Sequence, residues 1–554
     1  MTLRLRLLLA AVCALALTSL LANATPAMAR DDTYQLIEGT GSTWSQNAIN
    51  QWIADVSSVG IQVAYGGGGS SKGRRDFGEG TVDFAVTEIP FQGRDPRTGQ
   101  TDSANGRPFA YMPVVAGGTS FMYHLEIGGQ LYTGLRLSGE TITKIFTGKI
   151  TNWNDPEITE DNNGFALPST KIIPVVRSDG SGTSAQFTAW MDNQYPSMWR
   201  PFCDCSGLTS YYPIKDGFVA KDGSVGVAGH ISASYGNGTI GYVEYSYALN
   251  DNYPVAKVLN KAGYYVQPTA YNVAVALTKA RINEDSGSSQ YLTQELDGVY
   301  NASDPRTYPL SSYSYMVIPT SKSDPRMNEA KGRTLGDFAY YFLCQGQQEA
   351  PALGYSPLPL NLVKAGFAQV RKIPWADTAD KNPSTCDNPT FDPAHPDSNL
   401  LAEAAPQPEQ CDKVGEGPCG VTVAPTDDAP STSSPTAGGP GGTGGGNGGS
   451  APATSSVSPG GTSTTGPGGV VIPGGGSPTD GGVPTVGVEV PVAGTDPIQV
   501  SAQYFGTPTT VSQYRTAGNN RTLGVLVALE LLCLLIVPPV LVRMWRSRRA
   551  AGRP

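Results

Sequence analysis

The composition of residues 421–484, which are almost all Gly, Ser, Thr and Pro, limits where this chain can fold. Such a segment cannot bury enough apolar surface to offset the entropy of ordering it, so we predict a disordered linker. Aromatic and β-branched residues occur throughout 33–376 instead. That segment is long enough for two domains, and we expect the folded part of the 554-residue chain to lie there.

Two hydrophobic segments near the ends of the sequence predict its location. Residues 1–29 carry two arginines, a short apolar run and an Ala-Met-Ala site, the order of a secretory signal peptide. The run is too short to favour a first transmembrane helix. Residues 523–542 are long enough to span a bilayer, and the arginine-rich tail 543–554 predicts a cytoplasmic C-terminus. We expect an extracytoplasmic chain anchored to the cell membrane, with its N-terminus outside and with 485–522 as a juxtamembrane segment of unassigned function.

The cysteines outside the two hydrophobic segments are even in number. They are Cys203, Cys205, Cys344, Cys386, Cys411 and Cys419. In an exported chain this indicates disulfides, although six cysteines allow 15 pairings and the sequence does not choose among them. A metal site is the alternative, but there is no CxxC pair and the three histidines lie far apart. We expect no metal and no cofactor, and we interpret the Pro- and Asp-rich segment 377–420 as a disulfide-held extension.

The net charge of the chain is −9, and it stays negative when the basic residues of 1–29 and 543–554 are set aside. An acidic surface disfavours nucleic acid and anionic lipid headgroups as partners. Any site for an anion must therefore work through local donors against an unfavourable overall field.

The spacing of apolar residues alternates between two periods along 33–376. Strict alternation predicts strands near 61–65 and 82–86, and helical spacing predicts helices near 49–56 and 187–191. Short strands that lead through glycine-rich polar turns into helices indicate an α/β fold with mainly parallel sheets.

Three turns place glycines and hydroxyl residues at the start of a predicted helix: 39–44, 66–73 and 177–184. The first turn of a helix has free N–H groups and a partial positive charge, so it can bind an anion without a metal. Ordinary helix capping is the alternative, and Thr43 and Thr183 each stand three residues before a Gln, as in a capping box. Three such turns in one chain favour an anion site.

Motifs of common enzymes are missing from the sequence. The turn at 66–73 lacks the GK[ST] end of a nucleotide P-loop, and the turn at 39–44 lacks the third glycine of a dinucleotide fingerprint. The sequence contains no HExxH motif. We therefore expect a binding protein and not an enzyme.

Six collinear segments resemble the periplasmic phosphate-binding proteins of ABC importers. They are GTGSTW at 39–44, YGGGGSS at 65–71, TVDF at 81–84, GKITNWND at 148–155, RSDGSGTS at 177–184 and GYVEY at 241–245. The resemblance implies a two-lobed venus-flytrap fold of the type II periplasmic-binding-protein class over 33–376, with the anion at the hinge. It implies a first lobe of about 33–115 and 310–376 and a second lobe of about 116–309.

The same resemblance implies the residues that contact the anion. They are Thr43, Trp44 through its backbone N–H, Ser70, Glu88, Arg177, Ser181, Gly182 and Thr183. Asp179 would hold Arg177 in place without touching the ligand. Glu88 stands where the family usually has Asp, Trp44 replaces Phe, and the region 201–213 has no counterpart. The linker and the transmembrane helix are also additions to the family's usual form.

The function that the resemblance implies is capture of inorganic phosphate outside the membrane and its delivery to the permease of an ABC importer. Three alternatives stay open: a receptor for another oxyanion, a wall-spanning phosphate sensor or surface protein without a permease, and a phosphatase. Glu88 argues against fully deprotonated oxyanions, which a nearby carboxylate repels. A phosphatase would need a nucleophile or a metal cluster, and the sequence suggests neither.

Overall fold

The computed structural model describes residues 34–419 apart from 95–98, 100, 286, 289, 380, 384–385 and 392–397. The predicted signal peptide, linker, juxtamembrane segment, transmembrane helix and basic tail all lie outside the described residues. Within the described part of the chain, no helix has both the length and the apolar character needed to cross a membrane.

A mixed eight-stranded sheet lies at the centre of the described chain, in the order β11-β10-β12-β6-β17-β3-β1-β2. Its strands are β1 (Ile37–Gly41), β2 (Val63–Gly68), β3 (Phe84–Thr87), β6 (Phe109–Tyr123), β10 (Ile173–Arg177), β11 (Val219–Lys221), β12 (Thr239–Glu244) and β17 (Ser311–Pro319). β1 pairs in parallel with β2 and β3, and β10 pairs in parallel with β11 and β12. The predicted α/β class is confirmed, but the sheet is mixed because β6 and β17 run antiparallel to their neighbours.

The long strand β6 joins two halves of this sheet. Its residues 109–118 pair with β17, and its residues 119–123 pair with β12. The strands β2, β1, β3 and β17 are referred to below as the first half-sheet, and β12, β10 and β11 as the second half-sheet. The chain crosses from the first to the second through β6 and returns through β17.

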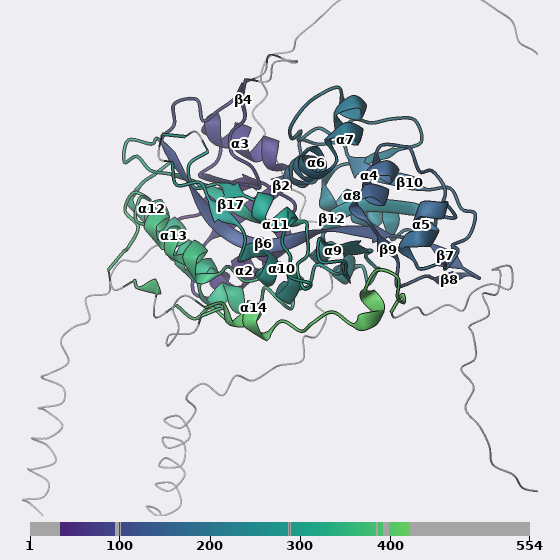
Figure 1. Ribbon diagram of the computed structural model, residues 1–554. Helices are drawn as coiled ribbons and strands as arrows, with labels where there is room; N and C mark the ends of the chain where they lie inside the picture. Colours follow the sequence, from purple (N-terminus) through teal and green to yellow (C-terminus); the bar gives the residue numbers. More distant parts are fainter. Residues whose placement is uncertain are drawn as a thin grey trace, which may run out of the picture. The chain divides into compact units, whose positions relative to one another are not determined.

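Helices cover the sheet, which explains why every residue of β17 is buried. Those packed near the first half-sheet are α2 (Gln46–Ser57), α3 (Ser70–Gly78), α12 (Glu329–Leu343) and α13 (Leu360–Val370). The chain that includes the second half-sheet contributes α4 (Gly139–Phe146), α5 (Pro156–Asp161), α6 (Gly182–Gln194), α7 (Pro196–Cys203), α8 (Gly223–Ile231), α9 (Tyr245–Asn250), α10 (Ala270–Leu277) and α11 (Asp297–Tyr300). Figure 1 shows α12 and α13 at one end of the sheet and α4, α5 and α7 toward the other.

Shorter elements complete the described chain. They are the sheet of β9 (Arg136–Leu137), β13 (Lys257–Leu259) and β14 (Tyr265–Val266), the pairs β4 (Gly93–Arg94) with β5 (Thr101–Asp102), β7 (Glu126–Ile127) with β8 (Gln130–Leu131) and β15 (Arg281–Ile282) with β16 (Gln294–Glu295), the helix α14 (Leu400–Ala404), and the 3-10 turns Gln345–Gln348 and Gln410–Asp412.

The predicted strands and helices are confirmed as β2, β3, α2 and α6, but both predicted capping boxes are wrong. The N-cap of α2 is Ser45, whose side chain makes no capping hydrogen bond. The N-cap of α6 is Ser181, whose Oγ accepts a hydrogen bond from the backbone N–H of Ser184 at 3.1 Å. Thr183 already lies inside the helix, so its hydroxyl is not the cap.

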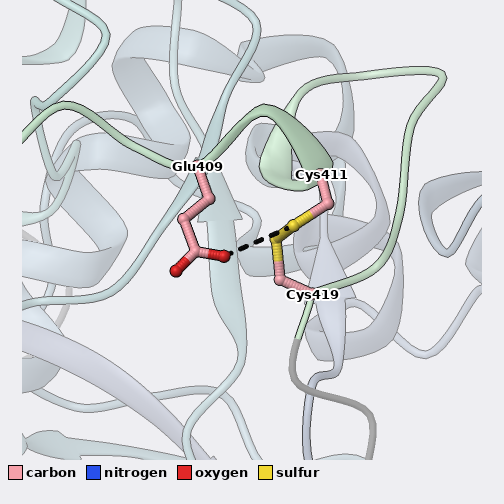
Figure 2. A group of neighbouring side chains, drawn as sticks. All are labelled: Glu409, Cys411 and Cys419. Atoms are coloured by element: carbon pink, nitrogen blue, oxygen red, sulfur yellow. Dashed lines mark hydrogen bonds between the residues drawn. A yellow bond between two sulfur atoms is a disulfide. The ribbon is translucent and has the colours of Figure 1, made fainter.

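The six cysteines form three disulfides: Cys203–Cys205, Cys344–Cys386 and Cys411–Cys419. The prediction of disulfides is confirmed, and Cys344–Cys386 ties the extension to the end of α12. Figure 2 shows Glu409 beside the third pair, with a carboxylate oxygen 3.4 Å from the Sγ of Cys411. Because both sulfurs of this pair are joined to each other, neither is a thiolate that could bind a metal.

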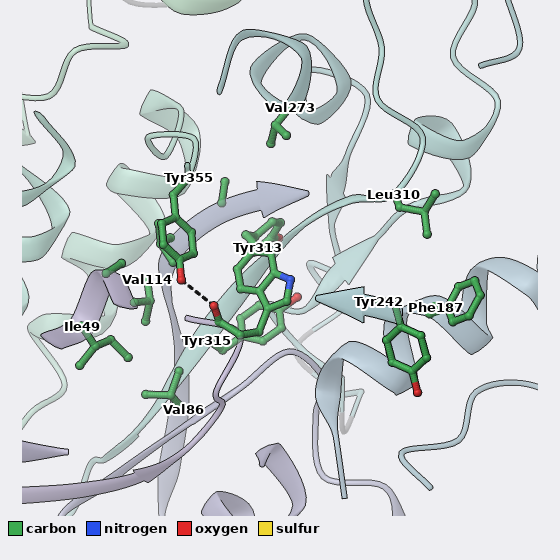
Figure 3. Packing of buried hydrophobic residues seen from close by; sticks show 14 of the residues in the cluster. Ile49, Val86, Val114, Phe187, Tyr242, Val273, Leu310, Tyr313, Tyr315 and Tyr355 are labelled. Carbon is green, nitrogen blue, oxygen red and sulfur yellow. Dashed lines mark hydrogen bonds between the residues drawn. The ribbon is translucent and has the colours of Figure 1, made fainter. Parts of the chain in front are cut away.

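The hydrophobic core continues from one half of the sheet to the other. Ile49 of α2 and Val86 of β3 belong to the part of the core at the first half-sheet, and Phe187 of α6 and Tyr242 of β12 belong to the part at the second (Figure 3). The ring centroids of Phe187 and Tyr242 lie 5.0 Å apart. This packing fixes the ends of β1, β3 and β10, from which the predicted site residues project.

Candidate functional site

The second and third glycine-rich turns of the sequence lie against each other. The backbone N–H of Ser71, in the first turn of α3, donates to the carbonyl of Gly180 at 2.9 Å. Gly69 has φ +89°, and a Cβ at this position would overlap the Oδ2 of Asp179. A Cβ at Gly180 would lie 2.5 Å from the Cβ of Ser71. The small residues that the sequence places here are therefore what allows α3 and α6 to begin side by side.

Glu88 lies at the centre of this junction, directly after β3, and only 1% of it is exposed. The hydroxyl of Ser42 donates to its Oε1, and the hydroxyl of Ser70 donates to its Oε2 at 2.5 Å. Gly182, the first residue of α6, lies so close that a Cβ there would overlap Oε2. Glu88 is therefore a buried acceptor and not an exposed salt-bridging residue.

The ionisation of Glu88 is balanced between opposing effects. Burial raises the pKa of its carboxyl group, while the hydroxyl donors of Ser42 and Ser70 and the positive charges of Arg177 and Arg74 lower it. Burial has the largest effect, so the pKa of Glu88 lies above its usual value.

Arg177 ends β10 and is buried, with its guanidinium held by Asp179. Its Nε donates to the Oδ1 of Asp179 at 2.6 Å, and its Nη2 pairs with Oδ2. Its Nη1 lies 3.4 Å from both Thr183 Oγ1 and Ser224 Oγ. The two-point contact fixes the plane of the guanidinium and directs Nη1 toward the hydroxyls, the supporting geometry expected of Asp179.

Thr43 and Trp44 connect the first turn to the opposite half of the structure. The Oγ1 of Thr43 accepts a hydrogen bond from the N–H of Ser224 at 3.1 Å. The hydroxyls of Tyr247 and Tyr355 donate to the carbonyls of Thr43 and Trp44, the latter at 2.6 Å. Because a peptide unit is planar and trans, the N–H of Trp44 points away from Tyr247. The indole ring itself is buried.

Three helices begin at this place: α3 at Ser70, α6 at Gly182 and α8 at Gly223. Each N-terminus carries a partial positive charge, and Arg177 adds a full one. The first two N–H groups of α8 already donate to Asp179 and Thr43. The structure thus brings together all the residues predicted from the sequence: Thr43, Trp44, Ser70, Glu88, Arg177, Asp179, Ser181, Gly182 and Thr183. The arrangement of positive charge and donors suits a small anion.

Ser42 and Ser224 are site residues that the sequence reasoning missed. Ser224 stands in an Asp-Gly-Ser run at 222–224, which repeats the run at 179–181 before α6. That repetition could have predicted a third helix start, that of α8, with Ser224 at the site. Ser42 gave no comparable signal, because its hydroxyl contacts Glu88, which lies 46 positions away in the sequence.

A cavity of about 770 Å³ lies next to the junction. Ser71, Arg74 and Asp102 line it on the side of α3, and Cys205 and Tyr211 line it on the other side. The region 201–213, which has no counterpart in the resembling family, therefore forms one wall of a polar cavity beside the site.

Comparison with known proteins identifies a family whose match spans all of these residues. Residues 24–345 match the family described as PBP superfamily domain. The chain belongs to the PBP superfamily. Similar superfamily members include "Phosphate-binding protein PstS" of Methanocaldococcus jannaschii, which is 31% identical over 363 residues covering 63% of this chain and 90% of the relative. The protein of the same name from Xylella fastidiosa is 32% identical over 346 residues, covering 62% and 86%.

Solved structures of the superfamily are also similar. A high-affinity periplasmic phosphate-binding protein (PfluDING) with bound phosphate matches with a TM-score of 0.47 and 19% identity, covering 60% of this chain and 93% of that one. The curated relatives and the family match confirm the resemblance to phosphate-binding proteins that the sequence indicated.

Proposed function

We propose that this chain captures inorganic phosphate outside the membrane and delivers it to the permease of an ABC importer. The observation that carries the proposal is the convergence of Arg177, three helix N-termini and a set of hydroxyls around the buried carboxylate of Glu88. The curated relatives are named as phosphate-binding proteins, which supports phosphate as the anion.

The proposed ligand set supplies ample binding free energy. Charge-assisted hydrogen bonds are each worth about 1.5–3 kcal/mol, and a micromolar Kd requires only about 8 kcal/mol in total. The proposed donors are Arg177, the hydroxyls of Thr43, Ser181 and Thr183, and the backbone N–H groups of Trp44 and Gly182. Ser70 would join them only by turning its single hydroxyl proton from Glu88 to the anion. The surplus offsets dehydration of the anion and the ordering that binding requires.

Selectivity in this proposal comes from Glu88. An ionised Glu88 accepts the hydroxyl of monohydrogen phosphate, whereas sulfate has no proton and meets a like charge in a buried place. This favours phosphate over sulfate or molybdate. The curated relatives are named as phosphate-binding proteins, so we propose that the chain is not an enzyme.

We further propose that the two half-sheets are the cores of two lobes, about 33–115 with 310–376 and 116–309, that move about β6 and β17. Thr43, Ser70 and Glu88 belong to the first lobe, and Arg177 and α6 belong to the second. The anion would then draw the lobes together, and the cavity beside Tyr211 would be the mouth of the cleft.

We propose also that residues 523–542 anchor the chain and that the linker 421–484 spaces it from the membrane. Protease added to intact, wall-stripped cells is expected to cut the linker and release a phosphate-binding fragment. Release without protease, or a protected linker, would contradict the anchor.

The function is tested by titration calorimetry of the full chain in detergent with phosphate, sulfate, arsenate and molybdate. We expect phosphate to bind with a micromolar or lower Kd and sulfate to bind far more weakly. The Arg177→Ala variant should bind phosphate at least tenfold more weakly, about 1.4 kcal/mol. No binding of phosphate by the parent, or unchanged binding by a folded Arg177→Ala variant, would refute the proposal.

A further inference from the structure

We propose that Ser42 fixes the orientation of the Glu88 carboxylate and thereby determines which anions the site accepts. The inference rests on the proposed function, because it concerns how the same site distinguishes phosphate from sulfate. Ser42 is a positioning residue in this proposal: it acts through Glu88 and does not touch the ligand.

The backbone holds Ser42 and Glu88 at a fixed separation. The N–H of Ser42 donates to the carbonyl of Val86 at 2.8 Å, two residues before Glu88. Gly41, with φ +134°, makes this approach possible, because a Cβ there would overlap the same carbonyl. The carbonyl of Ser42 accepts from the hydroxyl of Tyr65 at 2.8 Å, which fixes the other side of its peptide. The Ser42 side chain therefore starts from a rigid position beside Glu88.

The hydroxyl of Ser42 has one proton, and its other contact shows where that proton goes. Its Oγ accepts a hydrogen bond from the N–H of Ser45 at 3.3 Å. A backbone N–H can only donate, so the hydroxyl proton is available for the Oε1 of Glu88. Ser42 thus acts on Glu88 as a donor, which stabilises the ionised carboxylate and fixes its rotamer.

The second oxygen of Glu88 faces the opposite half of the structure. Its Oε2 accepts from Ser70 and lies against Gly182 at the start of α6. A carboxylate oxygen can accept more than one hydrogen bond, so Oε2 keeps acceptor capacity on the side where the anion would lie. With Oε1 bound to Ser42, the carboxylate cannot rotate to withdraw Oε2 from this position.

The charge of Glu88 depends on several surrounding groups. The groups that act on it electrostatically are Arg177 from β10 and Arg74 from α3, which favour the anion, and the buried phenols of Tyr65 from β2 and Tyr247 from α9. The pKa of both tyrosines is raised, mainly by burial, so they are neutral at physiological pH. Ser42 and Ser70 are the neutral donors that oppose the cost of burying the charge.

Removal of the Ser42 hydroxyl leaves Oε1 buried without that donor. The free energy of the ionised carboxylate rises, and Glu88 takes up a proton at a higher pH than in the parent. A protonated Glu88 donates a hydrogen bond where it previously accepted one. The site then disfavours monohydrogen phosphate and no longer repels sulfate.

The test is calorimetric titration of the full chain with phosphate and with sulfate between pH 5.5 and 8.5, in the parent and in Ser42→Ala. We expect the phosphate-to-sulfate affinity ratio at neutral pH to fall at least tenfold in the variant. We also expect the pH at which sulfate binding disappears to move upward. Ser42→Thr keeps the hydroxyl and should restore both values.

Ser45→Ala is the matched control, because it truncates a serine of the same turn whose Oγ has no hydrogen-bond partner in the described structure. It should leave the ratio and the pH profile as in the parent. Parent-like selectivity and pH dependence in Ser42→Ala would overturn the inference, as would an equal loss of both anions. If Ser42→Ala unfolds, a Ser42→Thr variant with altered selectivity overturns it as well. Failure of the parent to bind phosphate would instead refute the proposed function.

Discussion

A methyl group added at Gly182 tests whether the two halves of the site meet when the anion is bound. An ideal Cβ at this position would lie 2.9 Å from the Cδ of Glu88 and would overlap Oε2 and the hydroxyl of Ser70. Gly182 begins α6, whereas Glu88 directly follows β3 and Ser70 begins α3. The overlap can be relieved by moving the halves apart, so its cost should appear in binding and not in folding.

The magnitude follows from the size of the overlap. Inserting one methyl group into a packed place costs about 1–3 kcal/mol, which corresponds to a 5- to 150-fold weaker Kd for phosphate. Alanine is also preferred to glycine within a helix by about 1 kcal/mol, so the free energy of unfolding should stay level or rise. We expect Gly182→Ala to lose affinity without losing stability.

The assay is calorimetric titration with phosphate combined with urea denaturation of the same preparations. Gly229→Ala is the matched control, because Gly229 also lies in a helix, α8, but a Cβ there meets nothing within 4 Å. The control should gain stability and keep the parent Kd. Parent-like phosphate affinity in Gly182→Ala would refute the account, since it would mean that α6 does not approach Glu88 in the bound state.

Two further predictions concern stability. The Cys344–Cys386 disulfide spans 42 residues of sequence, whereas Cys203–Cys205 spans 2. Replacing the first pair by serines should therefore lower the free energy of unfolding by about 4 kcal/mol, and replacing the second pair should lower it by less than about 2 kcal/mol. Equal losses in urea denaturation would contradict this. Burial raises the pKa of Glu244 well above its usual value, so this group binds its proton more tightly in the folded chain. Its contribution to stability is therefore lost as pH rises from about 4.3 through its folded-state pKa. Glu244→Gln should weaken this loss, and an unchanged pH slope would count against it.

The sequence predicted the site well where the chemistry lies in a contiguous turn. Arg177, Asp179 and Gly182 all belong to one run of eight residues, and a strand before the run and a helix after it determine where they point. Ser70 could be predicted for the same reason, because it opens the helix that follows β2.

Contacts made by the packing of distant segments could not be predicted in this way. Ser224 meets Thr43 across 181 positions of sequence, and Tyr355 meets the carbonyl of Trp44 across 311. The antiparallel course of β6 and β17 was also missed, because the alternation of apolar residues is the same for either direction of a strand. The capping boxes were wrong because each helix begins at another residue. Ser181, two residues before Thr183, caps α6, and Ser45, two residues after Thr43, is the N-cap of α2.

The central claim is that the site recognises phosphate by its proton, through the carboxylate of Glu88. The most direct test is calorimetry of the Glu88→Gln variant of the full chain with phosphate and sulfate at neutral pH. Glutamine removes the charge and keeps the shape, so sulfate affinity should rise, phosphate affinity should change less, and the ratio between them should fall at least tenfold, about 1.4 kcal/mol. A phosphate-to-sulfate ratio equal to that of the parent would contradict the claim.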